Sequence, residues 1–224
     1  MDRSFQFVLS LSIIIAVIIG IVRYRKMDRA YYPFVYFTIV AFLMELAAHY
    51  MVKHRVQTEI IIAIVHVYGF LEFFLFARLF HNWGLFNRQK DVFYAVAGAG
   101  LAFCLGAVLL VHGLRELNYY FLIAYSFALI FFSVSSINKM VVHDRGNIFR
   151  NPQFIICLGI IIFYIFFILV NVTYLSGFRE NREISVSFRT NLQNINVYSN
   201  LLVNLLYAVA MIWIPRKQNF MMPF

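Results

Sequence analysis

Hydrophobic residues in this chain fall into seven long runs that are separated by short polar segments. A helix of roughly 20 residues, rising about 1.5 Å per residue, crosses the roughly 30 Å hydrocarbon core of a bilayer. The pattern predicts membrane-spanning helices over residues 5–22, 31–52, 58–80, 92–112, 117–138, 154–176 and 192–214. We therefore expect an all-α, polytopic membrane protein, a seven-transmembrane-helix bundle that takes up residues 1–224 as a single domain.

Proline positions support these boundaries. Pro152 and Pro215 stand at the ends of runs, and Pro33 falls in the first turns of the second predicted helix. Proline is best tolerated there, because inside a helix it removes a hydrogen bond and clashes with the preceding turn. The first run is followed by no small-residue cleavage site, so we interpret it as a retained helix and not as a signal peptide.

Composition agrees with a membrane protein and excludes a nucleic-acid-binding one. The hydrophobic fraction is 62% and the mean hydropathy is +0.78, above the apolar share of soluble domains, which is about half. The net charge of +9 arises from small groups of Lys and Arg at the ends of the apolar runs. A nucleic-acid surface needs a basic stripe with stacking aromatic residues, and the sequence has none.

The Lys and Arg residues also predict the orientation. Of these 19 residues, 12 lie on the side that carries the C-terminus and seven on the side that carries the N-terminus. The positive-inside rule then places the N-terminus outside and the C-terminus in the cytoplasm. We expect the basic inner residues to contact membrane lipids, and a cytoplasmic or membrane protein partner could dock on the same residues: Arg23, Arg25, Lys26, Arg88, Lys90, Arg145 and Arg150.

Polar residues inside the predicted spans are the candidates for function, because polar groups are costly in hydrocarbon unless they are partnered. Glu45 and His49 of the second helix are four residues apart and share a face. His66 of the third helix is the best candidate to approach them. The three could act as general acid and base, or hold zinc or iron, while the plainer alternative is a Glu–His pair that satisfies itself.

Further polar residues predict a cavity. Tyr68 and Glu72 share a second face of the third helix, and Glu72 could instead form only a buried hydrogen bond to a Tyr or Ser of another helix. The last helix has a continuous polar stripe made of Gln193, Asn196, Asn200, Asn204 and Tyr207. We expect an outward-open polar cavity between helices two, three, five, six and seven, with these ligand-binding residues: Glu45, His49, His66, Tyr68, Glu72, Asn171, Asn196, Asn200 and Asn204.

The segments at residues 45–49 (ELAAH) and 68–74 (YGFLEFF), together with the polar last helix, give this chain its one family resemblance. It resembles a group of small seven-helix bacterial membrane proteins to which no activity is attached. The resemblance implies a location in the bacterial cytoplasmic (inner) membrane and implies nothing about mechanism.

Three functions fit the sequence best, and a transporter ranks below them because the sequence shows no broken helices or internal repeats. The first is a receptor-like sensor that binds a small or lipidic ligand in the cavity and signals through a separate partner. The second is a non-catalytic membrane subunit of a larger complex, and the third is an intramembrane metal-dependent enzyme that acts on a lipid. A retinal protein is excluded, because the last predicted helix contains no lysine.

Overall fold

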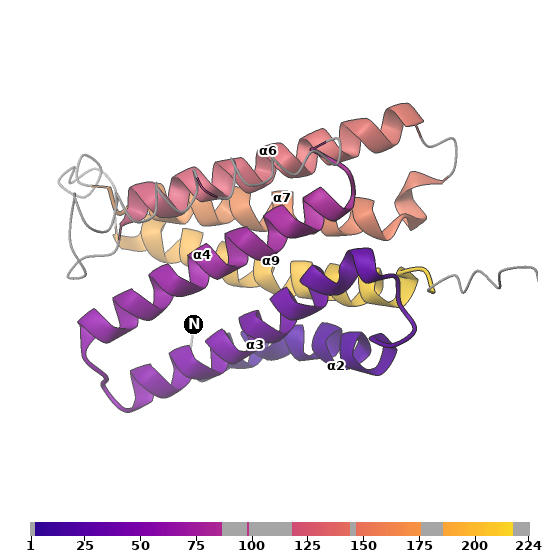
Figure 1. The fold of residues 1–224 in the computed structure, drawn as a ribbon. Coiled ribbons are helices and arrows are strands. Elements are labelled where there is room, and N and C mark those ends of the chain that lie inside the picture. Colours follow the sequence, from indigo (N-terminus) through magenta and orange to yellow (C-terminus); the bar gives the residue numbers. More distant parts are fainter. Residues whose placement is uncertain (1–2, 87–97, 99–117, 144–146, 176–185, 217–224) are drawn as a thin grey trace, which may run out of the picture.

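The computed structural model of this chain describes residues 3–86, 98, 118–143, 147–175 and 186–216. Within them, six helices are long and apolar enough to cross a membrane (Figure 1). These correspond to six of the seven predicted spans. The remaining prediction, over residues 92–112, lies outside the described residues apart from Gly98.

The first span is made of α1 (Arg3–Ser10), the 3-10 turn η1 (Leu11–Ile13) and α2 (Ile14–Arg23). The second and third spans are α3 (Tyr32–Lys53) and α4 (Thr58–Asn82). The later spans are α6 (Tyr119–His143), α7 (Pro152–Val172) and α9 (Val186–Trp213). Two more 3-10 turns, η2 (Arg29–Tyr31) and η4 (Ile148–Arg150), precede α3 and α7.

Local sequence explains where these helices begin. The Asn151 side chain accepts a hydrogen bond from the Gln153 backbone N–H at 2.9 Å, and Pro152 is the first residue of α7. Both residues suit a helix N-terminus, where the backbone N–H groups have no partner within the helix. The predicted boundary of the last helix is less accurate, since α9 begins at Val186 and not at residue 192. Hydropathy detects only the apolar part of a helix that continues into polar residues.

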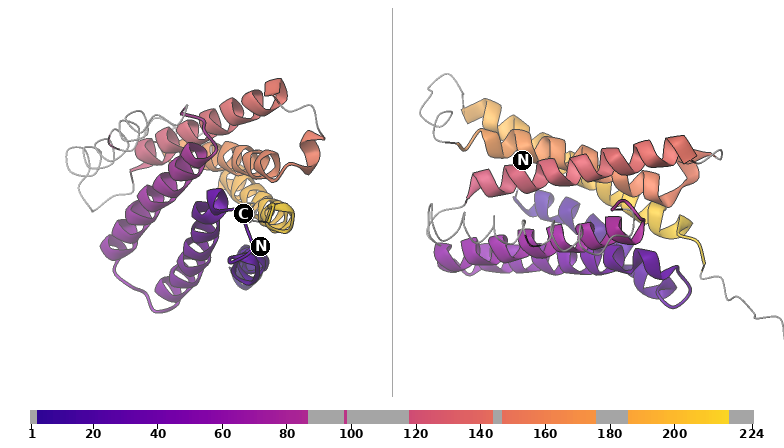
Figure 2. Two further views of the ribbon diagram at one scale, coloured as in Figure 1. Left: turned by 45° about the vertical axis from the view of Figure 1, so that its right-hand side comes forward. Right: turned by 45° about the horizontal axis from the view of Figure 1, so that its top comes forward.

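The six spans form a ring. Each helix contacts its neighbour in the order α2, α3, α4, α6, α7 and α9, and α9 closes the ring on α2. Two views from other directions show the same arrangement (Figure 2). The first and last spans of the chain therefore lie side by side, and α1 and η1 also contact α9.

The outer surface of the ring is apolar. Val22 and Val67 are 74% and 68% exposed, and many other large hydrophobic side chains face outward. Apolar surface this extensive is unfavourable in water and is suited to lipid. The six apolar helices and this surface identify an integral membrane protein.

At one end of the bundle, basic side chains satisfy backbone carbonyls. Arg23 donates hydrogen bonds from Nη1 to the Met211 and Ile212 carbonyls, the first at 2.5 Å, and from Nη2 to the Ile214 carbonyl at 3.0 Å. Lys139 Nζ donates to the Gly84 carbonyl at 2.6 Å just beyond α4. The last carbonyls of a helix lack intrahelical partners and attract cations, so these contacts stabilise the C-terminal ends of α9 and α4.

Aromatic side chains fill the centre of the ring. The ring of Tyr207 packs edge-on against Phe34 and Phe37, at centroid distances of 5.1 and 5.9 Å. On its other side Tyr207 lies against Gly159 of α7, where a Cβ would sit only 2.6 Å from Tyr207 Cε1. The glycine therefore permits the close approach of α7 and α9.

We expect Gly159→Ala to destabilise the protein, because the new methyl group must displace a ring that is held by Phe34 and Phe37. Overpacking of this kind costs about 1–3 kcal/mol, measurable as a lower unfolding midpoint in detergent. Gly69→Ala is the matched control, since its Cβ would meet nothing closer than 3.5 Å. Equal midpoints for the two variants would contradict this packing.

Candidate functional site

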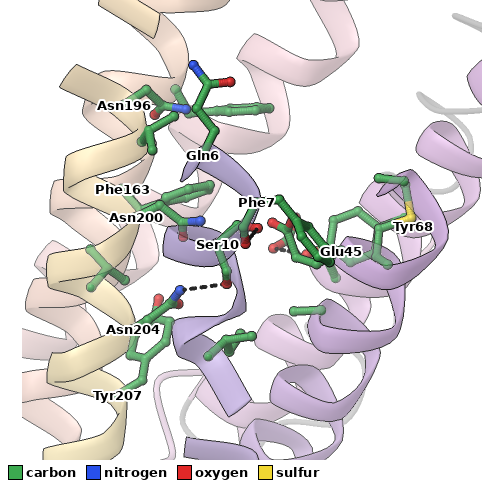
Figure 3. Close-up of a pocket in the computed structure, with 18 of the residues that line it drawn as sticks. Gln6, Phe7, Ser10, Glu45, Tyr68, Phe163, Asn196, Asn200, Asn204 and Tyr207 are labelled. Carbon is green, nitrogen blue, oxygen red and sulfur yellow. Dashed lines mark hydrogen bonds between the residues drawn. The ribbon is translucent and has the colours of Figure 1, made fainter. Parts of the chain in front are cut away.

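A pocket of about 680 Å³ lies inside the ring, between the first span and α3, α4, α7 and α9 (Figure 3). This volume is within the range of about 300–1,000 Å³ that is usual for ligand sites. Its polar lining consists of Gln6, Ser10, Glu45, His49, Tyr68, Glu72, Tyr164, Asn196, Asn200, Asn204 and Tyr207. Apolar side chains, among them Phe7, Met44, Phe163 and Phe167, make up much of the rest.

The wall on α9 is the predicted polar stripe. Asn196, Asn200, Asn204 and Tyr207 follow each other at spacings of four or three residues and all line the pocket. Figure 3 shows them one above another along the helix. Gln193, one turn earlier, does not line the pocket and donates a hydrogen bond to the Tyr174 hydroxyl.

The facing wall comes from the first span, which the sequence analysis did not include. Asn204 Nδ2 donates to Ser12 Oγ at 2.9 Å and to the Ser10 carbonyl at 3.5 Å, at the point where α1 gives way to η1. A 3-10 turn inside a longer helix leaves such carbonyls available and often marks a hinge. Gln6 and Ser10 line the pocket as well. The signal in the sequence is their spacing of four residues, which places both side chains on one face of the helix.

Glu45 and His49 occupy the α3 wall. The Ser10 hydroxyl lies beside the Glu45 carboxyl, and the His49 ring stacks on Phe7 with a centroid distance of 3.8 Å. Glu45 is half-buried, whereas His49 is exposed. The first span and α3 therefore meet at this point through one polar and one aromatic contact.

One polar group in the lining of the pocket is a buried carboxyl group that accepts hydrogen bonds from tyrosines. Glu72 is 4% exposed and accepts hydrogen bonds from the Tyr68 hydroxyl at 3.1 Å and from the Tyr125 hydroxyl at 3.3 Å. Tyr125 lies on α6, so Glu72 accepts the buried hydrogen bond from another helix that the sequence analysis gave as an alternative to ligand binding. Sequence reasoning named Glu72 but not Tyr125, because one tyrosine among many carries no distinguishing pattern.

Two predicted site residues lie outside the pocket. The ring of His66 is buried, its Nδ1 donates to the Ile62 carbonyl at 2.9 Å, and its Nε2 accepts from the Asn118 N–H at 3.3 Å. The Asn171 amide donates to the Phe167 carbonyl of its own helix at 2.7 Å. Both side chains satisfy nearby backbone groups and do not line this pocket.

The predicted approach of His66 to Glu45 and His49 is therefore wrong. The residues that the structure describes contain no group of three or more His, Cys, Asp or Glu side chains able to hold a metal ion. Both nitrogens of His66 are occupied by backbone partners, because a buried imidazole must satisfy them. The predicted cavity likewise has a different boundary, with the first span in place of the fifth.

Two buried polar atoms of the pocket have no hydrogen-bond partner among the described residues. One is the hydroxyl of Tyr164, which is 1% exposed and lies near Glu72; the other is Oδ1 of Asn196. Buried polar atoms in folded proteins are nearly always hydrogen-bonded to protein, water or ligand. Both residues line the pocket and add to its polar character.

Comparisons of this chain with protein-family models, curated proteins and solved structures find no match. The chemistry of the pocket itself is therefore the basis for a functional proposal.

We expect Tyr125→Phe to destabilise the bundle modestly, because it removes one donor from a carboxyl group that is shielded from water. Hydrogen bonds between membrane helices contribute roughly 0.6 kcal/mol on average and up to about 1.7 kcal/mol. Unfolding in a denaturing detergent, followed by circular dichroism, measures the difference. Tyr120→Phe is the control, since Tyr120 is exposed on the same helix; an equal effect of the two variants would contradict the role of Tyr125.

Proposed function

We propose that this protein is a receptor-like membrane sensor that binds a small amphipathic ligand in the pocket between its first and last spans. The observation that carries the proposal is a pocket of about 680 Å³ inside the helical bundle, lined by amide, carboxyl, hydroxyl and aromatic side chains. Polar groups on α9 and apolar rings on α7 give the pocket two chemically different walls. This combination suits a molecule with a polar head and a hydrocarbon part.

A route from the pocket to the other end of the bundle supports a signalling role. A ligand in the pocket would touch Ser10 on the first span and Asn204 on α9, which are hydrogen-bonded to each other. At the opposite end the same two spans are joined again by Arg23. A shift between them at the pocket would therefore change the Arg23 contact, where a partner could detect it.

The proposed orientation places the pocket in the outer half of the membrane, with the N-terminus outside and the C-terminus in the cytoplasm. The inner membrane of a bacterium is the proposed location. Arg25 and Lys26 are exposed next to Arg23 at the proposed inner surface, where they suit lipid phosphates or an acidic protein partner. The guanidinium group of Arg23 is bound to backbone carbonyls of α9, so Arg23 is not part of that docking surface.

The ligand should be detectable by native mass spectrometry of protein extracted in mild detergent. We expect an added mass on the unaltered protein and about tenfold less of it on Asn200→Leu, since a lost polar contact to a ligand costs about 1–2 kcal/mol. Asn138→Leu is the control, because Asn138 is exposed on α6 and outside the pocket. If every sample shows only the mass of the protein itself, with no added mass, the result would count against a retained ligand.

The orientation can be tested with a membrane-impermeant maleimide. His54 and Phe149 are exposed at opposite ends of the bundle, so cysteine is introduced at either position after Cys104 and Cys157 are replaced by alanine. We expect His54→Cys to react in intact cells and Phe149→Cys only after permeabilisation, as the positive-inside rule requires. The reverse pattern would show that the pocket opens to the cytoplasm.

A further inference from the structure

The lining of the pocket has two carboxyl groups, and its only basic side chain among the described residues is His49. Its two carboxyl groups belong to Glu45 and Glu72, and no described residue that lines it is lysine or arginine. Its one imidazole, His49, is stacked on Phe7 and exposed. An anionic head group would meet Glu45 without a compensating cation, which is costly away from water. The lining therefore disfavours carboxylate and phosphate head groups.

Two hydrogen-bond donors near the contact between Ser10 and Glu45 are already used, and acceptor oxygens remain beside them. The Asn204 amide donates to Ser12 Oγ and to the Ser10 carbonyl, which leaves its own oxygen as an acceptor. The Ser10 hydroxyl donates to the Phe7 carbonyl at 3.0 Å, so its oxygen and the neighbouring Glu45 carboxyl can both accept. The two tyrosines that contact Glu72 have also used their hydroxyl hydrogens.

Two further side chains that line the pocket, Asn196 and Tyr164, each have a buried polar atom. Asn196 Oδ1 is a buried acceptor without a donor, and the Tyr164 hydroxyl is buried without a partner in the described part of the chain. Asn196 lies toward the N-terminal end of the α9 stripe (Figure 3), and Tyr164 lies close to Glu72. Both side chains line the pocket, so a molecule that extends along it would contact both residues.

We propose that the pocket takes a cationic amphiphile, with a protonated amine as its head and a hydrocarbon chain as its tail. This inference rests on the proposed function and specifies the ligand class of the same site. An ammonium group has three donors and no acceptor, which matches the acceptor oxygens that Glu45, Ser10 and Asn204 present to the pocket. Phe7, Phe163 and Phe167 supply aromatic surface for the tail and for cation–π contact with the head.

The test compares three probes that differ only in the head group: dodecylamine, dodecanol and dodecanoate. Each is added at the same mole fraction to the purified protein in mild detergent, and bound adducts are counted by native mass spectrometry. We expect dodecylamine to bind most tightly, dodecanol more weakly, and dodecanoate least. Ala48→Phe, which fills part of the pocket, should reduce the binding of dodecylamine and dodecanol.

Glu45→Gln then separates charge from shape, because the side chain keeps its size and loses its carboxylate. We expect its affinity for dodecylamine to fall by about tenfold or more, as for a charge-assisted hydrogen bond, with dodecanol binding unchanged. Retained dodecanol binding also shows that the variant is folded. Glu59→Gln is the matched control, since Glu59 is exposed on α4 and outside the pocket.

The two proposals fail in different ways. If dodecanoate or dodecanol binds as tightly as dodecylamine and Ala48→Phe weakens that binding, the pocket is a ligand site but the cationic class is wrong. Dodecylamine binding that is unchanged in Glu45→Gln would overturn the cationic class as well. If no probe binds in a manner that Ala48→Phe alters, both the ligand class and the proposed function are wrong.

Discussion

A carboxyl group inside a membrane must have hydrogen-bond donors, and the interior of this bundle is organised around that requirement. Glu72 is held by Tyr68 of its own helix and by Tyr125 of α6. Because water cannot replace these donors in hydrocarbon, α4 and α6 must remain close enough to supply them. The carboxyl group of Glu72 and the nearby side chain of Tyr164 both line the pocket.

The same requirement closes the ring between the first and last spans. Asn204 bonds to Ser12 and Ser10 in the middle of the bundle, and Arg23 bonds to the C-terminal carbonyls of α9 at one end. Polar contacts at two levels of the bundle therefore hold the first and last spans together. The pocket adjoins the contact between Asn204 and Ser10. A ligand that competes for Ser10 or Asn204 acts on this pairing directly, which is why the site and the proposed signalling route share residues.

Sequence reasoning located most of the site, and its errors have a common cause. Glu45 and the asparagines of α9 were found because polar side chains stand out in apolar helices and helical spacing places them on one face. His66 was misplaced because the sequence does not show that a backbone N–H at Asn118 meets its ring. Tyr125, Gln6 and Ser10 were missed because their importance depends on which helices are adjacent.

The sequence by itself determined that the chain crosses a membrane through long helices and that asparagines line one face of the last of them. Hydropathy and helical periodicity are local properties, so residues close along the chain suffice to reveal them. Only the tertiary structure decided that the first span, and not α6, faces those asparagines, and that the carboxyl of Glu72 meets Tyr125. Helix order and rotation follow from packing between distant segments, and no local pattern encodes them.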